Sequence, residues 1–203
     1  MLNEFMKKSW LALVSALCFG LLVSAVNMAL AGKIKQNKID KRDGMLEKLF
    51  GQDCSFEGVK AEGAAEDAEP IYFVAKKGGQ VDGYALIWTG PGFAENIDLL
   101  VGFNAGLDML KGFAVMKSAE TPGFGDQITL EDKEGKYRPD LYYKDRFINK
   151  PIDKVLVRAD DNIADKHLKD EQVVTISGST VTSEAVIVIV NGAKKQMVKL
   201  LNK

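Results

Sequence analysis

The chain has 203 residues, with 27 lysines and arginines against 28 aspartates and glutamates, giving a formal charge of −1 at pH 7. This balance lacks the basic patch of a nucleic-acid-binding protein, so no nucleic-acid partner is expected. Two cysteines and one histidine, His167, argue against a zinc, haem or iron–sulfur site built from this chain alone. The length and composition fit one membrane element followed by one globular domain.

Residues 10–31 form an uncharged apolar stretch that is long enough to cross a bilayer. Lys7 and Lys8 precede it, and Trp10 stands at its edge, where interfacial aromatic residues are common. A cleaved signal peptide is the alternative, because Ala29-Leu30-Ala31 resembles a small-x-small cleavage site. The length of the stretch favours a retained transmembrane helix.

Small residues recur at every fourth position of this stretch, at Ala12, Ala16, Gly20 and Ser24. Such a stripe lets a second transmembrane helix pack closely, so a partner subunit is expected, although small residues are also frequent in membrane helices generally. The lysines and arginines between residues 33 and 42 outnumber those before the span, which alone would place the C-terminal part in the cytoplasm. The hydrophobic N-terminal segment has the form of an export signal, which would place the C-terminal part outside the cytoplasm. Composition leaves both orientations open.

The remainder predicts an α+β domain. Residues 32–50 have the pattern of an amphipathic connector helix, and residues 57–69 that of an exposed loop. Strands are expected from runs of β-branched and aromatic residues at 71–75, 81–89, 97–103, 113–116, 154–157 and 172–176. Turns are expected at 77–80, 90–93 and 104–106, and a short helical or irregular segment at 126–130.

A C-terminal helix is expected to begin at a cap formed by Thr182 or Ser183. Its apolar residues share one face, at Val186, Val190, Ala193, Met197 and Leu200. The predicted organisation is a segment over 1–9, a single transmembrane helix over 10–31, a connector helix over 32–50 and one strand-rich domain over 51–203.

A cluster of hydroxyl side chains precedes this helix. Ser177, Ser179, Thr180 and Thr182 surround Gly178, which lets the backbone approach a ligand closely. Backbone N–H groups and the dipole at a helix start favour an anion such as phosphate. Taken alone, such a pattern more often marks an ordinary helix cap.

A second loop, Glu120-Thr121-Pro122-Gly123-Phe124-Gly125, has a specified shape because its proline fixes φ while its glycines admit conformations closed to other residues. Thr121 can donate a hydrogen bond, and Phe124 can offer an aromatic face to a planar ligand. A simple Pro-Gly turn also explains this segment.

The segments 120–125 and 177–182 resemble two loops of the FMN-binding domains in the G subunit of the Rnf electron-transport complex. In that family the two loops occur in the same order and at a comparable spacing. The C subunit of the sodium-pumping NADH:quinone oxidoreductase is a close relative. The resemblance covers nearly the whole chain, including 90–93, and the short length is more like the Rnf subunit. It implies an electron-carrying subunit of an ion-translocating ferredoxin:NAD oxidoreductase, with other membrane subunits as partners.

The resemblance further implies one FMN per chain, joined by a phosphoester bond to Thr180 and installed from FAD by a flavin transferase. The phosphate would be held by Ser177, Gly178, Ser179 and Thr182. The isoalloxazine ring would lie near Glu120, Thr121, Gly123 and Phe124, with Phe93 as another aromatic neighbour and Trp88 in the core. The resemblance also implies an N-terminus in the cytoplasm and a flavin domain on the outer side of the inner (cytoplasmic) membrane.

Three positions depart from the family pattern. Val174 replaces a usual acidic residue, Ser179 a usual alanine, and Ser118 a common histidine. Val174 keeps open a flavin-free membrane-anchored assembly or binding subunit. The sequence also leaves open a C-type subunit of the quinone oxidoreductase, and a sensor that binds a phosphate ligand without a covalent bond.

Overall fold

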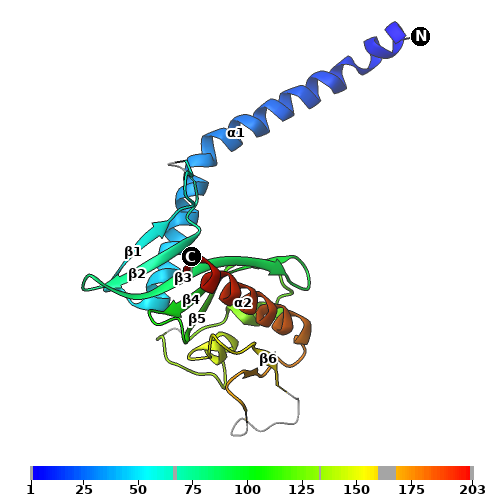
Figure 1. The fold of residues 1–203 in the computed structure, drawn as a ribbon. Coiled ribbons are helices and arrows are strands. Elements are labelled where there is room, and N and C mark those ends of the chain that lie inside the picture. Colours follow the sequence, from blue (N-terminus) through cyan, green and yellow to red (C-terminus); the bar gives the residue numbers. More distant parts are fainter. Residues whose placement is uncertain (1, 66–67, 133, 160–167, 202–203) are drawn as a thin grey trace. The chain divides into compact units, whose positions relative to one another are not determined.

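The computed structural model describes residues 2–65, 68–132, 134–159 and 168–201. It divides into two compact units, Met1–Lys41 and Arg42–Lys203 (Figure 1). The one histidine, His167, lies outside the described residues.

The N-terminal helix α1 (Leu2–Phe50) runs for 49 residues and contains both the expected transmembrane span and the expected connector. Among the described residues it is the one helix long and apolar enough to cross a membrane, with a segment of mean hydropathy 2.2 that has no buried residues. The end of the expected connector, from Arg42 onward, belongs to the second unit. Leu46 and Phe50 are buried, whereas Ile34 is exposed.

The second unit is built on a five-stranded antiparallel sheet whose strands follow one another in chain order. The strands are β1 (Cys54–Val59), β2 (Tyr72–Lys77), β3 (Gln80–Pro91), β4 (Asn96–Asn104) and β5 (Leu110–Lys117). Gly78 and Gly79 join β2 to β3 with φ angles of 58° and 84°. A two-residue hairpin turn of this kind requires positive φ at both positions, which explains the paired glycines.

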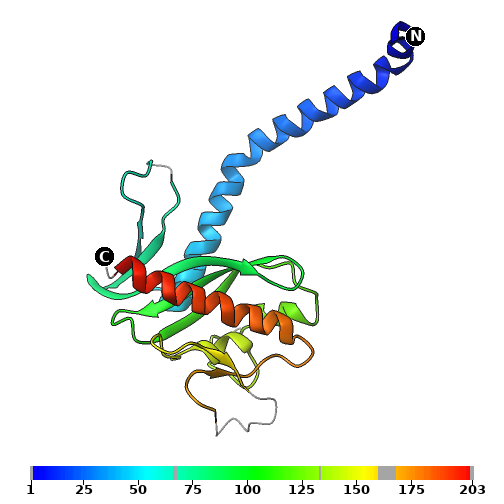
Figure 2. The same ribbon diagram turned by 45° about the vertical axis from the view of Figure 1, so that its right-hand side comes forward.

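Each face of the sheet is covered by a helix. Alternate side chains of β4, including Leu99 and Phe103, pack against α2 (Thr180–Leu201) in the main core. Leu100 points to the other face and packs with Leu46 and Phe50 of α1. This alternation follows from the two-residue period of a strand. Figure 2 shows α2 lying across the sheet.

Close contact between α2 and β3 depends on two positions without a Cβ. A Cβ at Gly192 would lie 2.5 Å from Nε1 of Trp88, and one at Gly90 would lie 2.5 Å from Cγ1 of Ile189. Trp88 is half-buried and packs against the main core, which confirms its expected place there.

The sequence patterns located most of the sheet but misjudged its ends. The strands expected between residues 71 and 116 are confirmed, as are the turn after Asn104 and the short helical segment, which is the 3-10 helix η1 (Gly125–Thr129). The expected loop at 57–69 is wrong at its start, because β1 extends to Val59. Strand β1 is an edge strand without a buried side chain, so its apolar alternation is weak.

The late strands are shorter than expected: among the described residues of this region, the structure has β6 (Val157–Arg158) and β7 (Gln172–Val173), which form a parallel pair. Asn191 of α2 bonds both the N–H and the C=O of Leu156, at 2.9 and 2.8 Å, so this residue pairs with a helix instead of a strand. Gly90 and Pro91 belong to β3, and the expected tight loop starts only at Gly92.

Lys194, on the buried face of α2, gives the domain a pH-dependent stability. Its ammonium donates to the backbone carbonyl of Lys154, and burial lowers its pKa to about 8, against the opposing effect of Asp153. Between about pH 8 and 10.5, the unfolded chain therefore holds a proton that the folded chain has lost.

The free energy of unfolding is therefore expected to rise with pH between these two values. Below about pH 8, Lys194 is protonated in both states and adds no pH dependence. Lys194→Met should remove this part of the rise. Urea titrations of the detergent-solubilised chain at pH 7.5 and 10 measure the difference, and equal pH slopes in the two proteins would contradict the assignment.

Candidate functional site

The hydroxyl-rich segment forms a tight turn that leads directly into α2. The N–H of Ser179 donates to the carbonyl of Ile176 at 3.0 Å, and Gly178 has a φ of +77°, which favours glycine at that position. Helix α2 begins at Thr180, and the carbonyl of Ser179 accepts the N–H of Ser183 at 3.0 Å. Ser179 thus occupies the cap position, and the expectation of a cap at Thr182 or Ser183 is wrong.

Ser183 braces this turn from inside the domain. Its fully buried hydroxyl accepts the N–H of Ile176 at 3.0 Å and donates to the carbonyl of Ser179 at 2.9 Å. The hydroxyl of Tyr143 donates to the carbonyl of Ser183 at 2.7 Å, and burial raises the pKa of this phenol. The start of the helix is therefore fixed to the core next to Thr180.

Replacing Ser183 with alanine should leave the N–H of Ile176 buried without its partner. The expected loss in the free energy of unfolding is about 1–3 kcal/mol. Ser177→Ala is the matched control, because Ser177 is exposed on the same turn, and it should change stability by less than about 0.5 kcal/mol. Chemical denaturation of both variants tests this, and equal stabilities would contradict the bracing role.

Glu120 joins three segments that are far apart in the chain. One carboxylate oxygen accepts the N–H groups of Phe93 and Ala94 at 2.9 and 3.0 Å, and the other accepts the hydroxyl of Thr182. The residue is only 5% exposed. The loop after β3, the loop after β5 and the first turn of α2 are thus held together by one carboxylate.

Two glycines leave room for this carboxylate. A Cβ at Gly92 would lie 2.5 Å from Oε1 of Glu120, and one at Gly125 would lie 2.9 Å from Oε2 and 2.8 Å from Oγ1 of Thr182. Ser118, at the position of a common histidine, accepts the N–H of Glu120 with its hydroxyl at 3.3 Å. The position of the Glu120 side chain therefore requires glycine at both Gly92 and Gly125.

These segments enclose a hollow of about 410 Å³. Its lining combines residues from all three segments: Phe93, Glu120, Thr121, Phe124, Gly125, Gly178, Ser179, Thr180, Val181 and Thr182. Most of the expected site residues lie here. Ser177 and Gly123 are exposed and lie outside the lining.

Two aromatic side chains stand exposed at the hollow. Phe93 is 66% and Phe124 is 56% exposed, which is unusual for phenylalanine in a folded domain. A planar, largely apolar ligand would cover them. The helix start with its hydroxyl groups offers N–H donors for an anionic group at the same hollow. The lining thus suits a ligand with a flat ring and a phosphate.

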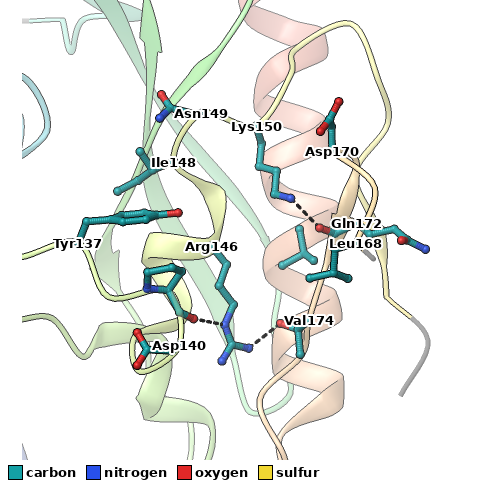
Figure 3. A pocket seen from close by; sticks show the side chains of 12 residues that line it. Tyr137, Asp140, Arg146, Ile148, Asn149, Lys150, Leu168, Asp170, Gln172 and Val174 are labelled. Atoms are coloured by element: carbon teal, nitrogen blue, oxygen red, sulfur yellow. Dashed lines mark hydrogen bonds between the residues drawn. The ribbon is translucent and has the colours of Figure 1, made fainter. Parts of the chain in front are cut away.

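A second hollow, of about 560 Å³, lies beside the segment that leads to the turn (Figure 3). Arg146 donates to the carbonyls of Pro139, at 2.9 Å, and Val174, at 2.8 Å, and Lys150 donates to the carbonyl of Gln172 at 2.8 Å. Burial lowers the pKa of Lys150. These cations hold the backbone that precedes Thr180.

Val174 lines this second hollow and not the hollow at Thr180. The neighbouring Asp170 and Glu171 both pair with Lys154, at 3.5 and 3.6 Å. The departure at Val174 thus changes a surface near the site and leaves the lining at Thr180 as it is.

Sequence patterns assign no site role to Ser183, Gly125, Tyr143 or Arg146. Ser183 stands out only as a cap candidate, and its spacing of seven residues from Ile176 has no local signature. In the described part of the chain, no group of three or more His, Cys, Asp and Glu side chains could hold a metal ion. Both cysteines, Cys18 and Cys54, are free thiols.

Comparisons with known proteins agree with this geometry. Residues 92–195 match the FMN-binding domain family. The chain is 30% identical to the G subunit of the ion-translocating oxidoreductase complex of Shewanella oneidensis, over 90% of this chain and 84% of that protein. It is 27% identical to the protein of the same name from Methanosarcina acetivorans, over 87% of this chain and 85% of that protein.

Among solved structures, the C subunit of the Na⁺-translocating NADH-quinone reductase from Parabacteroides distasonis is similar in fold. The TM-score is 0.53 at 20% identity, over 75% of this chain and 78% of that chain. The family match covers both loops of the hollow and the first turns of α2. The chain belongs to the FMN-binding domain family, among the G subunits of ion-translocating oxidoreductase complexes.

Proposed function

We propose that this chain is a membrane-anchored flavoprotein subunit that carries one FMN covalently and transfers electrons within an ion-translocating ferredoxin:NAD oxidoreductase complex. The observation that carries the proposal is the hollow itself. Its lining contains Thr180, the first residue of α2, and two exposed phenylalanines, Phe93 and Phe124. All of these residues lie in the segment that matches the FMN-binding domain family. Other membrane subunits of the complex supply and remove the electrons.

Thr180 is the attachment residue in this proposal. Its hydroxyl oxygen would become an ester oxygen of the FMN phosphate, with FAD as the donor and AMP, which takes up the hydroxyl proton, as the leaving group. A separate flavin transferase catalyses this step. The product is a phosphoester of Thr180, which leaves the redox-active ring unmodified.

The first turn of α2 offsets the phosphate charge. Its free N–H groups and the helix dipole favour an anion. Ser179 also lines the hollow, and its hydroxyl is a further hydrogen-bond donor. Thr182 has a different role, because its hydroxyl proton is directed to Glu120.

FMN supplies one- and two-electron redox chemistry, and the chain supplies its position and surroundings. Phe93 and Phe124 provide apolar surface for the ring and limit its contact with water. The loop after β3 is held in place by the N–H bonds of Phe93 and Ala94 to Glu120.

We further propose that α1 crosses the inner membrane once, with Lys7 and Lys8 on the cytoplasmic side and the flavin domain outside. The apolar, exposed stretch of α1 and the oxidoreductase complexes of the relatives support a membrane span. The orientation rests on the resemblance to the Rnf subunit, against the local count of lysines and arginines. In intact spheroplasts, added protease should degrade the domain. A domain that resists until lysis would reverse the orientation.

The flavin proposal is tested by co-expressing the full chain with a flavin transferase and viewing a denaturing gel under ultraviolet light. A fluorescent band at the mass of the chain is expected. A dark band would favour a flavin-free subunit if the native protein is also colourless. Flavin absorbance released on denaturation would favour a noncovalent site.

A further inference from the structure

Glu120 is the one ionisable side chain among the described residues that line the hollow. Its carboxylate is surrounded by donors: two backbone N–H groups and the Thr182 hydroxyl. Both oxygens act only as acceptors, which is the hydrogen-bonding pattern of an ionised carboxylate. A fixed negative charge therefore lies in the wall of the hollow.

In the described part of the chain, this carboxylate forms no ion pair with a lysine or arginine. None of the ion pairs between described residues includes Glu120, and the nearby Lys117 pairs with Glu95 at 3.6 Å. At 5% exposure, water and salt screen the carboxylate weakly. Its field therefore acts on whatever ligand occupies the hollow.

We propose that Glu120 lowers the midpoint potential of the flavin held beside Thr180 by placing a fixed negative charge at the hollow. This inference rests on the proposed function. Each electron that the flavin accepts adds one negative charge unless a proton follows from solvent, and a nearby anion opposes that addition. The reduced flavin is thereby a stronger electron donor to the next cofactor in the complex.

The charge and the contacts of Glu120 can be separated by substitution. Glu120→Gln keeps the shape: its amide oxygen can accept the N–H groups of Phe93 and Ala94, and its amide N–H can donate to Thr182. Thr182→Val does the reverse, since it removes one contact and keeps the charge. Glu120→Asp keeps the charge in a shorter side chain.

The experiment is a spectroelectrochemical titration of the full chain in detergent, with flavin attachment checked on a fluorescent gel. Glu120→Gln is expected to raise the midpoint potential, with a roughly tenfold shift of the one-electron equilibrium, or about 59 mV. Thr182→Val and Glu120→Asp are expected to show no rise. A role in packing alone would move the potential in all three variants or in none.

The outcomes separate this inference from the proposed function. A flavin-loaded Glu120→Gln protein with the wild-type potential overturns the inference and leaves the function intact. If Glu120→Gln does not fold, Glu120→Met is the uncharged variant of similar length: a raised potential in it, with no rise in Thr182→Val and Glu120→Asp, supports the inference, and a wild-type potential in it overturns the inference. A wild-type protein without flavin overturns both.

Discussion

Thr180→Val is expected to abolish the fluorescent band of the flavin-loaded chain on a denaturing gel. Valine matches threonine in shape but lacks the oxygen that forms the phosphoester. Thr180 is half-buried at the helix start, so the change should cost the domain less than about 1 kcal/mol of stability. The loss of flavin would therefore reflect chemistry and not unfolding.

Ser177→Ala is the matched control for this experiment. Ser177 lies on the same turn and also carries a hydroxyl, but it is exposed and outside the lining of the hollow. The control is expected to keep its full fluorescence. A Thr180→Val protein that still fluoresces after denaturation would show that the flavin is attached elsewhere.

Gly125→Val is expected to have the largest effect on the architecture of the site. The new Cβ would lie within 2.9 Å of both Glu120 and Thr182, where neither partner can move without breaking the bonds that join the three segments. Overpacking costs about 1–3 kcal/mol, and a buried carboxylate left with fewer donors adds to this. We expect a loss of about 2–4 kcal/mol, from these two effects together, and little flavin attachment.

Gly123→Ala separates this steric effect from backbone strain. Gly123 has a φ of +78° but open space where a Cβ would be. Its substitution should cost only about 1–2 kcal/mol, from the left-handed backbone, and the flavin band should remain. Urea denaturation of the two variants compares them, and an equal or smaller loss for Gly125→Val would contradict the proposed crowding around Glu120.

Local sequence features locate the two loops of the site correctly. Proline, glycine and clustered hydroxyls mark turns and helix starts because their effects on the backbone act within a few residues. The structure brings these loops together, 62 residues apart in sequence, through the bond between Thr182 and Glu120. Their spatial neighbourhood follows from the family resemblance and not from the residues themselves.

The specific partners of each side chain are beyond the reach of the sequence. Glu120 is expected beside the flavin ring, and the structure shows both of its oxygens bonded within the protein. Ser183 is expected to be an ordinary cap, yet it reaches back to Ile176. Such contacts depend on how a turn folds against the core, which hydrophobic periodicity does not encode.

The same limit applies to the short strands. The run 172–176 is rich in β-branched residues, but Arg146 donates to the carbonyls of Val174 and Thr175. Only Gln172 and Val173 then pair with β6. A side chain from a distant helical turn thus ends a strand that the local pattern predicts to continue.

One bond, between the oxygen of Thr180 and the phosphate of FMN, defines the proposed flavoprotein. Trypsin cleavage after Lys169 and Lys194 would release a peptide that contains Thr180 together with five more hydroxyl side chains, those of Thr175, Ser177, Ser179, Thr182 and Ser183. Fragmentation mass spectrometry of this peptide should show the mass of FMN less one water on Thr180. An unmodified peptide, or the added mass on another hydroxyl, would contradict the assignment of Thr180 as the attachment residue.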